Sequence, residues 1–274
     1  MAEESVESRE ERAKNSTSPE ELEKLAEDED YYVRSAVAEN PNTPASMLDK
    51  MADDEERYVR QNVARNPYTP AFVLEKEGRK KCWGKSLAED KDEGVRRYVA
   101  ENLNTPFPLL EILSKDYISD VRKTVAENSN TPVSLLEKLA EDKDEGVRRY
   151  VAENVNTPVS MLEKLTDDKV EGVRVGVAGN TNAPVSVLEK LAEDEHEWVR
   201  QEVARNANTP VSVLEKLTED KAKDSEDEKE SDASIINELT GFIYANKARD
   251  AFSFEWLLKE DINDFSVIPG IRID

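Results

Sequence analysis

The sequence predicts an all-α solenoid, because one short pattern recurs along most of its length. A proline returns at steps of 25, 26, 36, 26, 26, 26 and 26 residues: Pro19, Pro44, Pro70, Pro106, Pro132, Pro158, Pro184 and Pro210. A Val-Arg pair, first seen at Val33-Arg34, returns in the same register, and the apolar residues around it follow helical spacing. A unit of about 26 residues is too small to bury its own apolar face, so neighbouring units must stack. The single longer step marks a ten-residue insertion in the third unit.

Each unit is predicted to form two short helices. In the unit Asn130–Asn154, Thr131 is a candidate N-cap and Pro132 suits the first helical position. Residues 142–144 break the first helix and can cap the second. Asn154 falls where a left-handed C-cap is expected, since Asn tolerates that conformation.

The stretch NTPVSLLEKLAEDKDEGVRRYVAEN, residues 130–154, resembles the leucine-rich repeat variant family. The combination N-T-P, L-x-x-L-A-x-D and V-R-x-x-V-A-x-N carries this resemblance from about residue 15 to residue 220. The resemblance implies a right-handed superhelix of alternating α- and 3₁₀-helices without a sheet, and no catalytic activity. Some members carry a cysteine-ligated iron–sulfur cluster near the N-terminus. This chain has no cysteine there, so we do not expect that cofactor.

Three regions are predicted. Residues 1–220 form the solenoid, with the insertion near residues 77–86. Residues 221–232 form a charged linker, because the stretch from Glu219 to Asp232 holds eight acidic and three basic residues and no large apolar one. Residues 233–274 are rich in apolar residues and are expected to be a helical segment. That segment has three possible uses: it caps the solenoid, self-associates or docks a partner.

The composition excludes several classes of function. Asp and Glu number 61 against 38 Lys and Arg, so the formal net charge is −23. This charge makes general nucleic-acid binding unlikely and argues against docking on an anionic membrane. One cysteine and one histidine cannot build a disulfide, a cysteine-ligated zinc site or a histidine-rich metal site. No apolar stretch approaches ~20 residues, and the charged N-terminus is unlike a secretory signal. We therefore expect a cytoplasmic protein with no metal and no cofactor.

Superposing the units separates constant from variable positions on the second helix. The constant Val, Arg, Val, Ala and Asn fill one arc of the helix. We interpret its arginines as a structural ladder, since an aspartate recurs equally often and Arg suits carboxylate and carbonyl acceptors. The alternative is a stripe that grips an acidic ligand. The ladder comprises Arg34, Arg60, Arg96, Arg122, Arg148, Arg174 and Arg200. The recurring asparagines, such as Asn154, are interpreted as stacked caps.

The opposite, variable arc of the second helix is rich in tyrosine, tryptophan and arginine, the residues enriched at interface hot spots. The candidate binding residues on this arc are Tyr32, Tyr58, Arg97, Tyr98, Arg149, Tyr150 and Trp198. The alternative is neutral drift on a solvated surface. One unit has glycines on this arc, Gly172 and Gly176 among them, which suggests a shallow notch. The exposed side of the first helix reads Glu-Lys in most units and is interpreted as a solvated face.

The insertion forms a basic island inside an acidic protein. Its candidate binding residues are Arg79, Lys80, Lys81 and Trp83, which suit an acidic partner or a nucleic-acid strand, with the indole available for stacking. The alternative is a bulge that patches a weakened layer, since Glu77 falls where other units have Leu. Both interpretations stay open.

The function predicted first is a non-catalytic scaffold that binds a protein or peptide through the variable face of the second helices. No catalytic cluster is recognisable. One alternative is an enzyme or lyase on a helical-repeat scaffold, which requires a deep pocket that holds a carboxylate with a strongly shifted pKa. A second alternative is nucleic-acid contact confined to the basic insertion.

Overall fold

The computed structural model describes residues 4–75 and 86–224, with side chains up to residue 217. The chain divides into two compact units, Met1–Asn182 and Ala183–Asp274. Every regular element within the described residues is helical, so the predicted all-α repeat fold is confirmed. The insertion residues Arg79, Lys80, Lys81 and Trp83 lie outside the described residues, as does the predicted C-terminal segment 233–274.

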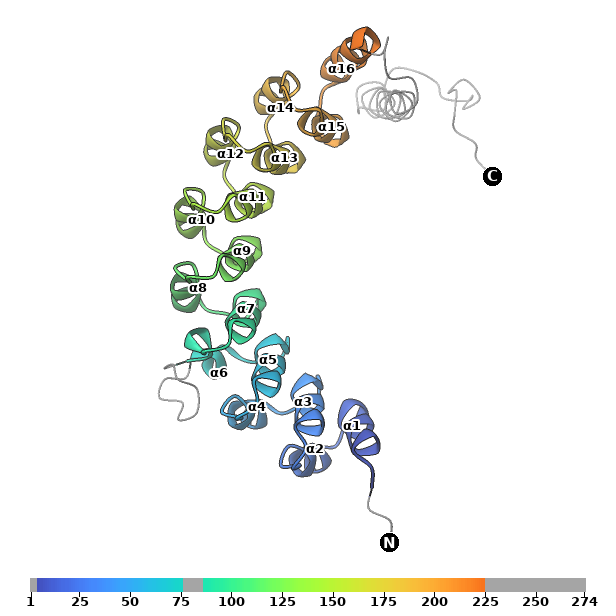
Figure 1. Cartoon of the computed structure of the whole chain (residues 1–274), viewed down its shortest axis with the longest axis vertical. Helices are drawn as coiled ribbons and strands as arrows, with labels where there is room; N and C mark the ends of the chain where they lie inside the picture. The colour runs from blue at the N-terminus through green and yellow to red at the C-terminus, as the bar shows by residue number, and fades with distance from the viewer. Residues whose placement is uncertain (1–3, 76–85, 225–274) are drawn as a thin grey trace, which may run out of the picture. The chain divides into compact units, whose positions relative to one another are not determined.

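The first unit alternates long and short helices, which lie in two layers (Figure 1). Each long helix from α3 onward is the second helix of a predicted repeat, and α1 precedes the predicted repeats. The long helices are α1 (Val6–Asn15), α3 (Tyr31–Glu39), α5 (Arg57–Arg65), α7 (Glu93–Glu101), α9 (Ser119–Glu127), α11 (Glu145–Glu153) and α13 (Glu171–Gly179). The short elements are α2 (Pro19–Leu25), α4 (Ala45–Met51), α6 (Ala71–Glu75), η1 (Leu87–Glu89), α8 (Phe107–Leu113), α10 (Val133–Leu139) and α12 (Val159–Leu165).

The second unit begins with a short and a long helix, but its last described helix is 14 residues long. It contains α14 (Val185–Leu191), α15 (Glu197–Arg205) and α16 (Val211–Asp224). Helix α16 runs past Asp220, where the solenoid was predicted to end. Residues 225–232 of the predicted linker lie outside the described residues.

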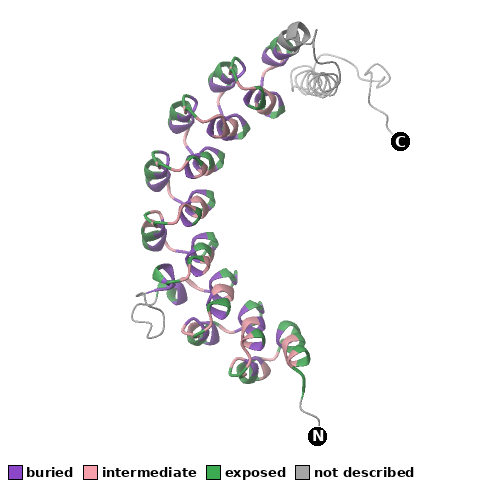
Figure 2. Ribbon diagram, in the orientation of Figure 1, coloured by how far each residue is buried: buried purple, intermediate pink, exposed green. Residues whose placement is uncertain are grey.

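The core lies between the two layers of helices. Within one repeat, Leu136 of the short helix and Val147 and Val151 of the long helix have no exposed surface. Figure 2 shows the same buried stripe on successive helices of the first unit. Full burial of one such side chain contributes about 1.5–3 kcal/mol. Each repeat therefore depends on its neighbours to cover the apolar stripe that it cannot bury alone.

Of the helix caps predicted for residues 130–154, the one at the start of the long helix is confirmed. Asp144 caps α11, because its carboxylate accepts the N–H groups of Gly146 and Val147. The prediction for Thr131 is wrong. Its hydroxyl donates to the carbonyl of Val125, 2.6 Å away, so it ties the loop to the preceding long helix. Pro132 takes the N-cap position instead, with extended backbone at φ −71° and ψ 153°.

The predicted left-handed cap at Asn154 is also wrong. Its backbone is extended, with φ −67° and ψ 129°. The helix ends here because the Asn154 side chain replaces the helical bonds: its Oδ1 accepts the N–H of Asn156 at 2.8 Å. Its Nδ2 is then free to reach the preceding repeat.

The short helices are α-helical through their middle, and i→i+3 bonds tighten both ends. In α10 the N–H of Leu135 donates to Pro132, and the N–H of Asp142 donates to Leu139. Within the described residues, η1 is the only element that is 3₁₀ throughout. The 3₁₀ character implied by the family resemblance thus lies in the end turns of the short helices.

The insertion divides one short helix without breaking its layer. Val73 and Leu74 of α6 are buried, and Leu87 of η1 is buried at the position that Leu139 occupies in α10. The chain therefore completes the layer with Leu87 after the insertion. Glu77 lies outside the described residues, so the interpretation of the insertion as a patch for a weakened layer stays a hypothesis.

Candidate binding face of the long helices

The constant arginine joins neighbouring repeats. Arg148 donates from Nε and Nη2 to the two carboxylate oxygens of Asp168, at 2.6 and 3.0 Å. Its Nη1 donates to the backbone carbonyl of Asp142, at 2.9 Å. Asp142 belongs to the repeat of Arg148, and Asp168 belongs to the next one. One guanidinium thus satisfies acceptors in two successive repeats.

The same arrangement recurs through the first unit. The pairs are Arg9–Asp28, Arg34–Asp54, Arg60–Asp90, Arg96–Asp116, Arg122–Asp142 and Arg148–Asp168. Arg174 and Arg200 donate to the backbone carbonyls of Asp168 and Asp194. Arg60 and Asp90 are the most deeply buried pair, with 2% and 0% of their side chains exposed.

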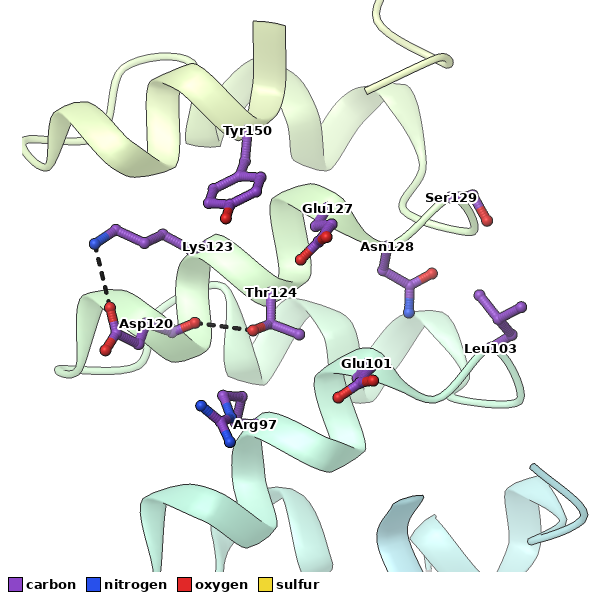
Figure 3. Close-up of a pocket in the computed structure, with 10 residues that line it drawn as sticks. All are labelled: Arg97, Glu101, Leu103, Asp120, Lys123, Thr124, Glu127, Asn128, Ser129 and Tyr150. Atoms are coloured by element: carbon purple, nitrogen blue, oxygen red, sulfur yellow. Dashed lines mark hydrogen bonds and ion pairs between the residues drawn. The ribbon is translucent and has the colours of Figure 1, made fainter. Parts of the chain in front are cut away.

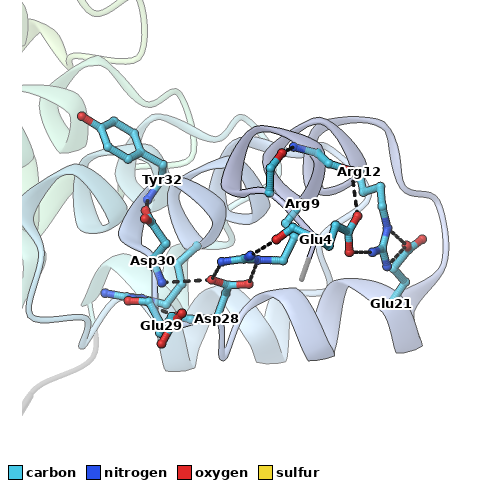
Figure 4. A network of polar contacts seen from close by, with 11 residues as sticks. Glu4, Arg9, Arg12, Glu21, Asp28, Glu29, Asp30 and Tyr32 are labelled. Atoms are coloured by element: carbon cyan, nitrogen blue, oxygen red, sulfur yellow. Dashed lines mark hydrogen bonds and ion pairs between the residues drawn. The ribbon is translucent and has the colours of Figure 1, made fainter. Parts of the chain in front are cut away.

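Arg9 is a member of the ladder that the sequence patterns missed. It binds Asp28 with two hydrogen bonds, at 2.7 and 3.1 Å (Figure 4). Ser8 stands where later units have Val, so no Val-Arg pair marks it. The available signal was spacing: Arg9 precedes Arg34 by the same 25 residues that separate Pro19 from Pro44.

The ladder aspartates Asp28, Asp142 and Asp168 are stabilised in their ionised form. Burial alone would raise the pKa of the Asp142 carboxyl, but the hydrogen bonds from Arg122 and from the N–H of Asp144 lower it overall. The same balance lowers the pKa of Asp168, whose donors are Arg148 and the N–H of Val170. Because these guanidinium groups are already engaged, the contacts favour a structural role for the ladder over ligand binding.

Asparagines form a second set of links between repeats. Asn154 donates from Nδ2 to the carbonyls of Ala126 and Asn128 in the preceding repeat, at 2.6 and 3.2 Å. A further asparagine two positions later was missed by the sequence analysis: Asn130 donates to Leu103, and Asn182 to Val155. The recurring pattern N-x-N-T-P carried the signal, since its second Asn is nearly as regular as its first.

The structure distributes the predicted binding residues along the layer of long helices. Tyr32, Tyr58 and Trp198 are exposed, at 54%, 44% and 62%. Arg97 and Arg149 are also exposed, whereas Tyr98 and Tyr150 are half-buried. Trp198 belongs to the second unit, where its ring lies 5.1 Å from that of His196. In the first unit the predicted residues fall into an aromatic group and a groove.

The aromatic group lies on α3 and α5. The Tyr31 ring stacks on Tyr32 and Tyr58, with centroids 4.2 and 6.0 Å apart, and Arg57 lies 4.8 Å above the Tyr58 ring. The hydrogen bond to Tyr32 raises the pKa of Tyr31 to about 12. Tyr31 was not predicted as a binding residue, although it directly precedes Tyr32.

The groove crosses α7, α9 and α11 (Figure 3). It has a volume of about 510 Å³ and is open to solvent along its length. Its lining comprises Arg97, Glu101, Leu103, Asp120, Lys123, Thr124, Glu127, Asn128, Ser129 and Tyr150. A smaller groove of about 250 Å³ contains Tyr58 and shares Arg97 and Asp120 with the larger one. Of these residues, only Tyr58, Arg97 and Tyr150 were predicted as binding residues.

Arg97 and Arg149 differ in the side chains that they contact. Arg97 lies 5.2 Å from the centroid of the Tyr98 ring, and Arg65 lies 5.6 Å from the same ring. Arg149 is held by Glu153 on its own helix, at 2.7 Å. Arg97 is therefore available at the edge of the groove, whereas Arg149 is engaged beside it.

The ionisable groups, the candidate metal ligands and the hydropathy of the helices can each be described for the residues that the structure covers. Each described carboxyl group whose pKa departs from its usual value has that pKa lowered, as in Glu111 beside Lys138. In the described part of the chain, no three His, Cys, Asp or Glu side chains gather where they could hold a metal ion. None of the described helices is both long and apolar enough to cross a bilayer.

Comparisons with known proteins bear on the fold. Residues 31–56 and 120–144 match the family described as leucine rich repeat variant. A solved leucine-rich repeat variant with a novel repetitive structural motif has 22% sequence identity to this chain and a TM-score of 0.57; the match covers 87% of this chain and 88% of that one. The Escherichia coli protein YibA has 17% identity over 89% of this chain and 98% of that one, and its TM-score of 0.45 is too low to indicate a shared fold.

Among curated proteins, none matches this sequence at a significant level. The two matched segments each contain a ladder arginine, Arg34 and Arg122, within a helix pair of the first unit. The family match and the likeness to the solved variant agree with the helical repeats of the structure. The predicted resemblance is therefore confirmed for these two segments, and the chain is a helical repeat protein whose fold is similar to that of the solved leucine-rich repeat variant.

Proposed function

We propose that this protein is a non-catalytic scaffold that binds a protein or peptide along the layer of long helices in its first unit. The observation that carries the proposal is the groove over α7, α9 and α11, which lies on the side of the helices where repeats differ in sequence. The constant side chains are occupied between repeats. The variable ones, Arg97 and Tyr150 among them, line the groove.

The shape of the groove favours a macromolecular partner. An open groove that spans three helices offers an extended contact surface, whereas small-molecule sites enclose most of their ligand. Tyrosine and arginine are the residues that dominate binding energy at protein interfaces. Exposed side chains of this kind on successive helices suit a partner that lies across the repeats.

The test is capture of partners from the native host by the full chain and two double variants. Arg97→Ala with Tyr150→Ala alters the groove. Lys138→Ala with Lys164→Ala removes two exposed side chains from the short-helix layer and serves as the control. We expect a partner that the wild-type chain and the control capture and the groove variant loses.

Thermal unfolding of the variants checks that the groove variant is folded. Equal capture by all three proteins, with the groove variant folded, contradicts the proposal. A partner lost only from the control variant also contradicts it, because the short-helix layer is then the binding face.

A further inference from the structure

Two carboxylates in the groove have no partner within the described residues. Glu101 on α7 and Glu127 on α9 occupy equivalent positions in adjacent repeats, and both are exposed. Neither takes part in a hydrogen bond or an ion pair in the part of the chain that the structure describes. Figure 3 shows Glu127 beside the Tyr150 ring and Glu101 farther along the groove, toward Asn128 and Leu103.

The groove lining has fewer basic side chains than acidic ones: Arg97 and Lys123 against Glu101, Asp120 and Glu127. The Lys123 ammonium lies 3.2 Å from the Asp120 carboxylate and 3.4 Å from that of Asp144. Arg97 lies over Tyr98 at the α7 edge of the groove. Neither basic group forms an ion pair with Glu101 or Glu127 within the described residues, and the lining of the groove keeps a formal net charge of −1.

The repeat sets the spacing of these two charges. Packed helices lie about 8–10 Å apart, so equivalent side chains on α7 and α9 are separated by a similar distance. A polyproline II chain rises about 3.1 Å per residue and presents every third side chain on one side, which gives a repeat of about 9 Å. The spacing between every third side chain of such a peptide therefore matches the spacing between Glu101 and Glu127.

We propose that the groove binds a basic segment of a partner protein in the polyproline II conformation, with Lys or Arg at every third residue. One cation pairs with Glu101 and the next with Glu127, while the exposed edge of the Tyr150 ring supports the aliphatic or cationic part of a side chain. The net charge of −23 attracts such a segment over longer distances. This inference rests on the proposed function and names the class of partner.

The experiment measures binding of two labelled peptides of identical composition to the full chain. One is acetylated Pro-Pro-Lys repeated three times, and the other carries six prolines followed by three lysines. The groove variant combines Glu101→Gln and Glu127→Gln. The matched control combines Glu137→Gln and Glu163→Gln, which remove the same charge from equivalent positions of adjacent short helices.

We expect the spaced peptide to bind more tightly than the clustered one. The groove variant should weaken binding of the spaced peptide about tenfold, because two exposed charge pairs each contribute severalfold, and the control should weaken it less than about twofold. Equal weakening by both variants, equal binding of both peptides or no binding at low salt would overturn the inference. If partner capture still depends on Arg97 and Tyr150 in that case, the scaffold proposal stands and only the class of partner is wrong.

Discussion

At the residue scale, a single guanidinium links two repeats because its geometry matches three acceptors at once. Arg148 is planar and fixed in shape, so its Nε and Nη2 face the Asp168 carboxylate while Nη1 faces the Asp142 carbonyl. A lysine offers no such fork. Two charged groups that are buried away from water lose their hydration. Removing one of them leaves the other buried without a partner, which lowers the free energy of unfolding.

Replacement of Arg148 by methionine tests this directly. Arg148→Met leaves the largely buried Asp168 carboxylate unpaired, so the free energy of unfolding should fall by about 3 kcal/mol. The neighbouring Arg149→Met removes an exposed pair with Glu153 and should cost less than about 1 kcal/mol. Urea denaturation measures both. Equal losses in the two variants would show that the ladder contributes no more than a surface pair, and lost partner binding without lost stability would favour the ligand-binding interpretation.

The ladder aspartates also predict a dependence of stability on pH. The pKa of Asp142 is lowered in the folded chain below its usual 3.8, so its contribution is fully present above that value. The contribution is lost as the pH falls through the lowered pKa, and Asp28 and Asp168 behave alike. We expect Asp142→Asn to be less stable than the wild type at neutral pH and to lose less stability between about pH 4 and pH 2. Denaturation curves at several pH values check this; parallel pH profiles for the two proteins would contradict it.

At the element scale, the close packing of α13 against α11 depends on a glycine on the face where the sequence predicts a notch. Gly176 of α13 is buried, and a Cβ built there lies 3.1 Å from the Cβ of Ala152 and 3.1 Å from the carbonyl oxygen of Arg149. These atoms belong to α11, so Gly176 permits close approach of two helices. Gly172, one turn earlier, has no atom within 4 Å of its Cβ position.

The two glycines of α13 should therefore respond oppositely to alanine. Gly172→Ala should stabilise the chain by about 0.5 kcal/mol, because alanine favours the helix and meets nothing. Gly176→Ala should destabilise it by about 1 kcal/mol or more, because a backbone carbonyl must move. Thermal unfolding of both variants checks this. A stabilising Gly176→Ala would show that α11 and α13 can separate without cost.

The helix pair within each repeat could be predicted from the sequence, whereas most contacts between repeats could not. The 26-residue period and the apolar spacing fixed the helix pairs, because stacking is the only way to bury so short a unit. The hydrogen bonds of Thr131 and Asn154 were mistaken for local caps, since a single repeat cannot show that their partners lie in another helix. The glutamates of the groove were missed for a related reason: Glu101 and Glu127 become neighbours only when the repeats stack.

At the scale of the whole molecule, the register of the first unit survives a ten-residue insertion. Arg60 before the insertion binds Asp90 after it, at 2.7 Å, as the equivalent pairs do elsewhere. The sequence on either side is also complete: residues 73–76 joined to residues 87–90 read V-L-E-K-L-A-E-D, identical to residues 187–194. The repeat pattern and the ladder contact are therefore intact across the insertion.

Deletion of residues 77–86 should give a folded chain that is more stable than the wild type. Holding the two ends of ten extra residues in one layer costs about 2 kcal/mol of chain entropy, and the deletion joins Lys76 directly to the buried Leu87. We expect a gain of about 1–2 kcal/mol in the free energy of unfolding. A second variant, in which glycine and serine replace residues 77–86 at the same length, keeps the loop and should stay near the wild type. The contradicting outcome is a deletion variant that is less stable than the wild type while the replacement variant is not. The ten residues would then be needed to keep Leu87 in the layer of short helices, and the repeat pattern alone would not set the register across the insertion.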